Sequence, residues 1–260
     1  MTRHLFNSAS SRPTASAAVA DLRQQIERLE RGSRIHETLP FGIEAVDNHL
    51  PGGGLARGAL HEVIEAGPVA EFAGSATLFT AGIAARLKGP VLWCLTRRDL
   101  FAPGLANAGL LPSRVTYAEA GRERDVLPLV EEGLRERGLA VVIGEVTRLT
   151  LTASRRLQLA AEGSGVTALI LRRWWTVAEK DLVALPSAAV TRWRIAPAPS
   201  EPVPAPGLGR AQWQVNLVRC RGSEPRSWIL EACDAKGRLA LPAALAGRQD
   251  PAAARRATAR

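Results

Sequence analysis

The sequence predicts an α/β fold in which a mostly parallel sheet is covered by helices. Short apolar runs of strand length alternate with helical segments between residues 59 and 171, a pattern typical of sheets built from right-handed crossover connections. Two of these runs, Pro90–Thr96 and Leu139–Gly144, are apolar almost throughout, as expected of strands covered on both faces. Two later strand patterns, Trp213–Cys220 and Ser227–Ala232, flank a short polar turn and predict an antiparallel C-terminal hairpin at the sheet edge.

The first 34 residues are expected to form a loose arm and one N-terminal amphipathic helix. Residues 1–16 are rich in Ser, Ala and Thr, and such segments bury little apolar surface. From Ala17 to Arg31 an apolar residue recurs every three or four positions, which predicts a helix. The apolar stripe consists of Val19, Leu22, Ile26 and Leu29. Two roles stay open for this stripe: packing on the chain's own core, or docking a partner.

The core is expected to span residues 35–235, followed by a basic tail rich in Ala and Arg over residues 236–260. A glycine-rich turn at Pro51–Gly58 leads into the strand Ala59–Glu65, and its glycines allow the positive φ angles of tight turns. The elements expected next are helix Gly74–Leu87, strand Pro90–Thr96, helix Pro103–Leu110, strand Arg114–Ala118, helix Asp125–Arg137, strand Leu139–Gly144, helix Thr152–Glu162, and strands Val166–Leu171 and Thr191–Ile195. A Pro-rich loop over residues 196–207 then precedes the hairpin.

The charge balance permits nucleic acid or an acidic protein as a partner. The chain carries 34 Lys and Arg residues against 25 Asp and Glu, a formal net charge of +9. Only Lys88, Lys180 and Lys236 are lysines, so the basic surface is almost wholly arginine. A GC-rich genome, whose codons favour arginine, accounts for most of that ratio. Arginine also binds phosphate and carboxylate through two parallel hydrogen bonds, which keeps both kinds of partner open.

Cysteine and histidine usage predicts neither a disulfide framework nor a metal site. Three cysteines are far apart in the sequence, namely Cys94, Cys220 and Cys233. The four histidines show no spacing typical of metal ligands: His4, His36, His49 and His61. The chain has no apolar run of about 18 residues and no apolar signal segment near Met1. We therefore expect a cytoplasmic protein that is neither exported nor inserted into a membrane.

A phosphate-binding loop is expected after the strand Ala59–Glu65, but its essential residues are missing. The motif GxxxxGK[ST] surrounds phosphates with backbone N–H groups and supplies a lysine for the β- and γ-phosphates. Here Gly67 and Gly74 stand two residues further apart than in that motif, and Ser75 occupies the lysine position. The sequence therefore predicts a degenerate nucleotide site and no cofactor.

The order of these elements resembles the RecA-fold core, and the chain resembles the ImuA family. The resemblance covers roughly residues 35–235, and its most specific parts are the turn Pro51–Gly58 and the hairpin segment Arg219–Glu231. ImuA proteins are RecA-like partners encoded beside the pseudo-polymerase ImuB and an error-prone DnaE-type polymerase. The resemblance implies a role in damage-induced (SOS) mutagenic translesion DNA synthesis. It also implies an ImuB-like protein as a partner, with RecA and single-stranded DNA as further candidates and self-association left open.

Two more departures from a recombinase, besides Ser75, predict that the chain is not an enzyme. Where a recombinase carries a catalytic Glu after its second central strand, this chain has Arg97 or Arg98. At the end of the next central strand Gly144 replaces the Asp that helps to hold Mg²⁺, and Glu145 comes one residue late. Phosphoryl transfer needs each of these charges. The resemblance thus implies a non-catalytic adaptor.

A group of four residues is a candidate surface for single-stranded DNA. The segment consists of Arg172, Arg173, Trp174 and Trp175. Paired arginines contact a phosphate backbone and tryptophans stack on bases in many single-strand binders. Tryptophans at the end of a sheet strand also serve as a cap over the core or as a protein contact. Both interpretations stay open.

Two other functions compete with the adaptor. One is a nucleotide-binding switch with weak ATPase activity. The other is a cell-division inhibitor of the SulA type, which has a RecA-like core without a phosphate-binding loop. SulA-type inhibitors are shorter and do not need the N-terminal helix, the Pro-rich loop or the hairpin, so the sequence favours the adaptor.

Overall fold

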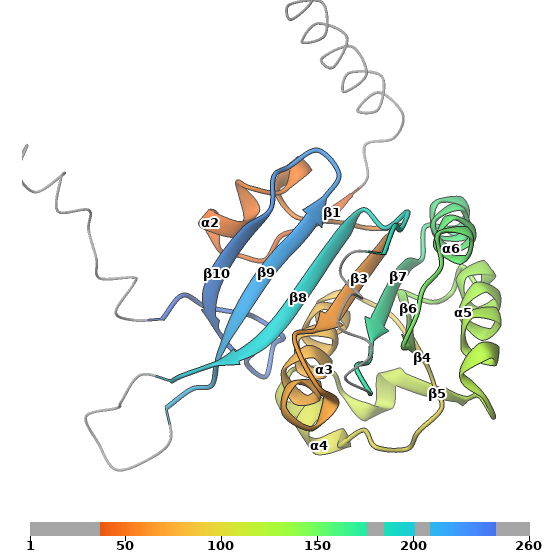
Figure 1. The fold of residues 1–260 in the computed structure, drawn as a ribbon, viewed down its shortest axis with the longest axis horizontal. Helices are drawn as coiled ribbons and strands as arrows, with labels where there is room; N and C mark the ends of the chain where they lie inside the picture. The colour runs from red at the N-terminus through yellow and green to blue at the C-terminus, as the bar shows by residue number, and fades with distance from the viewer. Residues whose placement is uncertain (1–36, 176–184, 201–208, 243–260) are drawn as a thin grey trace, which may run out of the picture. The chain divides into compact units, whose positions relative to one another are not determined.

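The computed structural model describes residues 37–175, 185–200 and 209–242, which form an eight-stranded sheet with helices on both faces (Figure 1). The strands stand in the order β10-β9-β8-β3-β7-β6-β4-β5. Their bounds are β3 (Leu60–Glu65), β4 (Val91–Leu95), β5 (Val115–Glu119), β6 (Val141–Val146), β7 (Thr167–Arg172), β8 (Thr191–Ala198), β9 (Gln212–Cys220) and β10 (Arg226–Glu231). The predicted N-terminal helix with its Val19, Leu22, Ile26 and Leu29 stripe lies outside the described residues.

Most of the sheet is parallel. Strand β3 pairs in parallel with both β7 and β8, and β4 pairs in parallel with β5 and β6. The hairpin of β9 and β10 adds antiparallel strands beyond β8. The predicted α/β class, with a mostly parallel sheet and an antiparallel C-terminal hairpin, is confirmed.

Helices connect the parallel strands and cover the sheet. Their bounds are α3 (Val69–Arg86), α4 (Ala102–Asn107), α5 (Val126–Arg135) and α6 (Leu151–Ser164). Helices α5 and α6 pack side by side over β3, β4, β6 and β7, whereas α3 packs over β3, β7 and β8 (Figure 1). Every residue of β3, β6 and β7 is buried, because both faces of these central strands are covered. The apolar run Leu139–Gly144 predicts this for β6, whereas β3 also buries His61, Glu62 and Glu65.

An aromatic layer holds the hairpin half of the sheet against α3. Trp193 of β8 lies 5.9 Å from Phe79 of α3 and 6.3 Å from Trp228 of β10, measured between ring centroids. Trp213 of β9 meets Phe79 edge-on at 6.4 Å. Such aromatic pairs are worth about 0.5–1.5 kcal/mol each beyond their buried area, so the hairpin belongs to the main core.

A small sub-structure precedes β3. It comprises β1 (Thr38–Leu39), α2 (Glu44–Asp47), the 3₁₀ turn Pro51–Gly53 and β2 (Leu55–Ala56), with β1 and β2 antiparallel. The Asp47 carboxylate accepts hydrogen bonds from the backbone N–H groups of Phe41 and Gly42, at 2.6 and 2.8 Å. A Cβ at Gly54 would lie 2.6 Å from the Leu39 carbonyl oxygen, so the glycine turn requires glycine there because two backbones meet.

The packed chain continues past the expected boundary at residue 235. Leu239 is buried, and Ala240 forms an antiparallel bridge with Glu231 at the end of β10. The segment at least to Pro242 therefore belongs to the core rather than to a tail.

Candidate functional site

The predicted phosphate-binding loop does not exist as a loop. Strand β3 ends at Glu65 and helix α3 already begins at Val69, so only residues 66–68 join them. The prediction that the helix starts at Gly74 is wrong: Gly74 lies inside α3, where a Cβ would have open space. Glycine lowers helix propensity by about 1 kcal/mol, and the packing of α3 on the sheet overrides that preference. A loop that surrounds phosphates is therefore not formed between Gly67 and Gly74.

Backbone N–H groups in the first turn of α3, which could bind an anion, already donate to carbonyl groups of the protein. The Val69 N–H donates to the Trp174 carbonyl at 2.9 Å, and the Glu71 and Phe72 N–H groups donate to the Pro68 carbonyl at 3.1 and 3.2 Å. Helix N-termini bind phosphate through N–H groups that have no such partners. The predicted site residue Ser75 is also used internally, because its buried hydroxyl donates to the Phe72 carbonyl at 3.0 Å.

Gly144 faces the wrong side of the sheet for a metal-binding acid. A Cβ on Gly144 would lie 2.5 Å from Cγ2 of Val130 in α5. The next residue, Glu145, turns to the α3 side and accepts a hydrogen bond from the Trp93 indole N–H at 2.7 Å. On β6 the acidic side chain that faces α3 is thus that of Glu145. The period-two alternation of β6 carried this signal, since neighbouring strand residues point to opposite faces.

A buried cluster of charges lies between α3 and the carboxyl ends of the central strands. Arg173, just after β7, is its centre. The Arg173 guanidinium lies 2.9 Å from Glu65 Oε1 and 2.8 Å from Glu145 Oε2. The same guanidinium donates to the hydroxyl of Thr77 in α3 at 2.9 Å. The second oxygen of Glu65 accepts the backbone N–H of Trp174 at 2.7 Å. This cluster ties β3, β6, β7 and α3 together with paired charges.

Burial shifts the protonation of the cluster. Desolvation raises the pKa of the Glu65 carboxyl above its ordinary 4.5, against the opposing effect of Arg173. Desolvation also raises the pKa of Glu145, again opposed by Arg173. For Arg173 itself, desolvation lowers the pKa, but attraction from Glu145 and Glu65 exceeds this effect and the pKa is raised overall. One guanidinium thus balances two carboxyl groups that are costly to bury as charges.

A second buried cluster occupies the opposite face of the sheet. Arg172 pairs with Glu62 of β3 at 3.0 Å, and the other Glu62 oxygen accepts from Arg192 of β8 at 3.1 Å. Desolvation lowers the pKa of Arg172, although Glu62 opposes the shift. Arg172 and Arg173 are 0% and 3% exposed. The expectation that these two arginines form part of a surface for single-stranded DNA is therefore wrong, because the two consecutive residues at the end of β7 enter opposite buried faces and meet glutamates of β3.

The two predicted tryptophans are half-buried, and each makes different contacts. Trp174 anchors the end of β7 through its backbone contacts to Glu65 and Val69. The Trp175 ring lies beneath the guanidinium of Arg97, 4.2 Å from its centroid. Trp175 and Arg97 thus form a stacked pair near the carboxyl ends of β7 and β4, and Arg97 is exposed.

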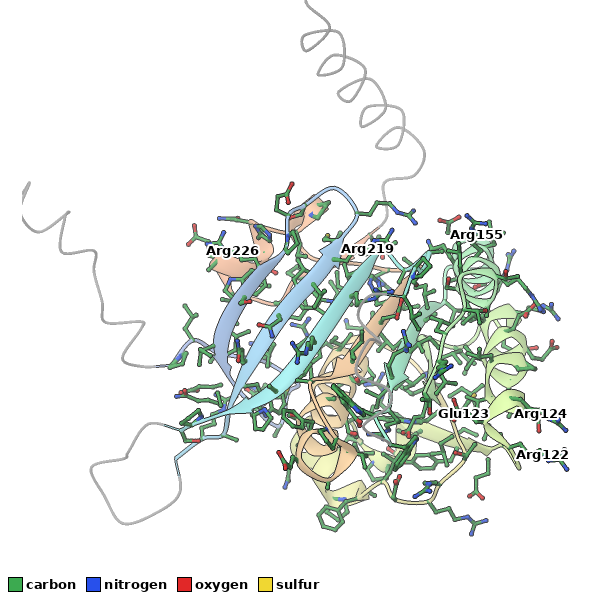
Figure 2. The ribbon with its side chains drawn as sticks, viewed as in Figure 1. Arg122, Glu123, Arg124, Arg155, Arg219 and Arg226 are labelled. Carbon is green, nitrogen blue, oxygen red and sulfur yellow. The ribbon has the colours of Figure 1, made fainter. Side chains whose placement is uncertain are left out.

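Exposed arginines lie near both ends of the sheet. Arg98, predicted at the degenerate site, pairs with Glu119 at the end of β5, at 2.6 Å. Arg122 and Arg124 flank Glu123, which bonds to the backbone N–H of Thr147 at 2.6 Å (Figure 2). Figure 2 also shows Arg219 and Arg226 near the hairpin turn, at the other end of the sheet. The basic side chains that are accessible are therefore not those of the predicted Arg172–Arg173 pair.

Neither a metal centre nor a membrane span is found in the described part of the chain. No three His, Cys, Asp or Glu side chains of residues 37–175, 185–200 and 209–242 come together as potential metal ligands. Within the same ranges no helix has the length and apolar character needed to cross a bilayer.

Comparison with known proteins places the chain in a family. No family model matches the sequence. The protein named Protein ImuA from Caulobacter vibrioides strain NA1000 / CB15N is 40% identical over 216 residues, which is 80% of this chain and 88% of that protein. Protein ImuA from Caulobacter vibrioides strain ATCC 19089 / CIP 103742 / CB 15 matches to the same extent. Because the alignment spans most of both proteins, the chain belongs to the ImuA family.

Proposed function

We propose that this chain is a non-catalytic, RecA-like adaptor of mutagenic translesion DNA synthesis. Membership of the ImuA family supports a place in the ImuA–ImuB mutagenesis cassette. The pseudo-polymerase ImuB is then its main partner. RecA and single-stranded DNA are further candidates, and the fold itself does not decide between them.

The observation that carries the non-catalytic part is the position of Arg173. In α/β folds phosphates bind at the N-terminus of the helix that follows a central strand. Here the Arg173 guanidinium contacts Thr77 inside that helix and holds Glu65 and Glu145 at 2.9 and 2.8 Å. An arginine within the fold thus supplies the positive charge that a lysine and Mg²⁺ would bring to a working site.

The buried charges have a structural consequence for an adaptor. Opening this site for a nucleotide would separate Arg173 from two buried carboxylates, and leaving such charges unpaired costs about 3–5 kcal/mol. The arrangement of β3, β7 and α3 is therefore held without a ligand. An adaptor of this kind presents the same surfaces whether or not ATP is present.

Single-stranded DNA stays a candidate partner, but we place its contact on other residues than the predicted arginine pair. The accessible stacking pair is Arg97 on Trp175, and Arg122 and Arg124 follow the neighbouring strand β5. Aromatic stacking with nearby arginines is the usual chemistry of sequence-tolerant single-strand binding. We place any such contact on these residues rather than on Arg172 and Arg173.

Co-purification tests the adaptor role. The tagged chain and an ImuB-like protein from the same organism should form a complex of equal affinity with ATP, with ADP and without nucleotide. Complex formation that requires ATP would favour the nucleotide-binding switch instead. Absence of any complex would contradict the adaptor role itself.

A further inference from the structure

The outer edge of β10 offers backbone groups for a further strand. The Glu231 N–H points away from β9 and donates to the Ala240 carbonyl at 2.8 Å. Because backbone direction alternates along a strand, the N–H and C=O groups of Ser227 and Ile229 point to this same outer side. Among the described residues no hydrogen bond reaches these two backbones from that side. An open edge of this kind is a template for another extended chain.

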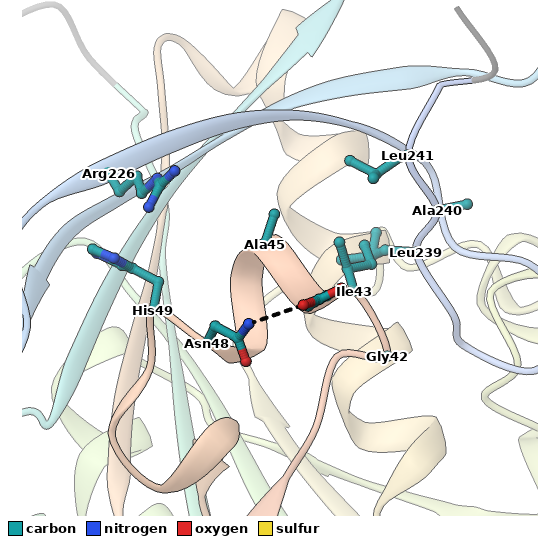
Figure 3. A pocket seen from close by; sticks show the side chains of 10 residues that line it. Gly42, Ile43, Ala45, Asn48, His49, Arg226, Leu239, Ala240 and Leu241 are labelled. Carbon is teal, nitrogen blue, oxygen red and sulfur yellow. Dashed lines mark hydrogen bonds between the residues drawn. The ribbon is translucent and has the colours of Figure 1, made fainter. Parts of the chain in front are cut away.

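A pocket of about 670 Å³ runs beside this edge. Figure 3 shows that α2 forms one wall, with Arg226 at one end and Leu241 at the other. Its lining includes Ile43, Glu44 and Asn48 from α2 and the residues next to it, Arg226 of β10, and Leu241. The Trp228 indole N–H donates to the Ala45 carbonyl at 3.2 Å and fixes β10 against α2. From Arg226 to Ile229 an extended strand spans about 10 Å, enough for roughly three residues of an added peptide.

Pro242 interrupts the ladder that Ala240 starts. Ala240 pairs with Glu231 in antiparallel register, so Pro242 falls opposite Ile229. Proline has no N–H, and it cannot donate to the Ile229 carbonyl. The bridge at Glu231 shows that the edge accepts an extended segment, and within residues 37–175, 185–200 and 209–242 no backbone group bonds to Ser227 or Ile229 from that side.

The charges of the pocket favour an acidic side chain on the incoming strand. Arg226 is exposed, and none of the described carboxylates lies within ion-pair distance of its guanidinium. Glu44 of α2 also lines the pocket and accepts a hydrogen bond from Asn48 at 3.3 Å, so an acidic side chain is favoured only beside Arg226 and not along α2. Ile43 and the half-exposed Leu241 offer apolar surface further along. The complementary peptide is therefore extended, apolar at one end and acidic where it passes Arg226.

We propose that β10 binds an extended acidic and apolar segment of the chain's protein partner by β-strand addition. Main-chain hydrogen bonds to Ser227 and Ile229 would supply affinity, and the pocket beside α2 would select alternate side chains. This inference rests on the adaptor role and names the surface that the adaptor uses. The proposed β10 surface is independent of the predicted N-terminal apolar stripe, which is a separate candidate for docking a partner.

Amide hydrogen exchange of the full chain, free and bound to the ImuB-like protein, tests the proposal directly. Strand addition should slow exchange at Ser227 and Ile229 at least about tenfold. The amides of Trp228 and Leu230 point toward β9 and provide an internal control, since their protection should change much less. Exchange at Ser227 and Ile229 that is equally fast in the complex would overturn the proposal.

Two variants test the same surface by affinity. Ile229→Pro removes one outward N–H, whereas the matched control Ile229→Thr keeps the backbone and the β-branched shape. We expect the proline variant and Arg226→Glu each to weaken the complex about tenfold or more, and the threonine variant to change it less than about threefold. Wild-type affinity in a folded Arg226→Glu and unaltered exchange at Ser227 would reject β10 while leaving the adaptor role intact. Failure of the wild-type chain to bind at all would reject both.

Discussion

Arg173 and Glu65 form a buried ion pair with 2.9 Å between Nη1 and Oε1, beside the helix that follows β3. The pair joins residues 108 positions apart in the sequence. The same guanidinium also donates to the hydroxyl of Thr77 inside α3 at 2.9 Å. Glu145 of β6 shares the same guanidinium at 2.8 Å.

Replacing Arg173 should be strongly destabilising. In Arg173→Met two buried carboxyl groups lose their cation, and we expect the free energy of unfolding to fall by about 3–5 kcal/mol. Urea unfolding measures this change. The matched control is Arg98→Met, which breaks the exposed pair with Glu119 and should cost less than about 1 kcal/mol.

A triple variant separates charge pairing from general damage at the same site. Replacing Arg173, Glu65 and Glu145 together by Met removes all three charges, and we expect it to regain most of the stability that Arg173→Met loses. Equal stability of Arg173→Met and the wild-type chain would contradict the cluster's importance.

The buried carboxyls should make stability fall as pH rises above 4.5. The pKa of Glu145 is raised in the folded protein above the ordinary value of 4.5, so the native state binds more protons than the unfolded state between 4.5 and the raised pKa. Over that window unfolding becomes more favourable with rising pH. Glu145→Gln cannot ionise and should show a shallower decline. Urea midpoints of both proteins across this pH range measure the difference, and parallel curves would speak against it.

Two glycines of the predicted nucleotide site should respond in opposite ways to alanine. In Gly144→Ala the new Cβ would press on Val130, and overpacking of this kind costs about 1–3 kcal/mol. In Gly74→Ala the methyl group enters open space within α3, so stability should rise by about 0.4–1 kcal/mol. Thermal unfolding of the two variants compares them. A stable Gly144→Ala would mean that the glycine is not required by the α5 contact.

The stacked pair of Arg97 and Trp175 is the place to test single-strand binding. Replacing both by Ala should weaken binding of an oligothymidylate by roughly tenfold at constant salt, because stacking contributes about 1–3 kcal/mol per base. The melting temperature should change little, since Arg97 is exposed and Trp175 is only half-buried. Unchanged affinity in the folded double variant would remove this pair from DNA binding.

Much of the fold could be predicted from the sequence, because its signals are local. The apolar runs that became β4 and β6, and the hairpin of β9 and β10, were placed correctly to within a few residues. The start of α3 was not, because Gly67 and Gly74 look like a loop motif while tertiary packing makes the second one helical. Local propensity cannot reveal such an override.

The site was harder to predict because its residues meet only through long-range packing. Arg172 and Arg173 read as a basic surface segment, yet each finds a β3 glutamate across the parallel pairing of β3 with β7. The alternation of strand faces could have separated the two arginines, and also Glu145 from Gly144. Their glutamate partners could not be identified without the strand order.

The most direct test of the central claim is a calorimetric titration of the purified chain with ATP and Mg²⁺, with and without single-stranded DNA. Because Arg173 is already engaged in ion pairs with Glu65 and Glu145, we predict no saturable binding up to about 1 mM ATP, which means a binding free energy weaker than about −4.1 kcal/mol. Saturable binding of ATP with a micromolar dissociation constant would contradict this prediction. Tighter ATP binding by Arg173→Met than by the wild-type chain would show that Arg173 competes with a nucleotide for the site.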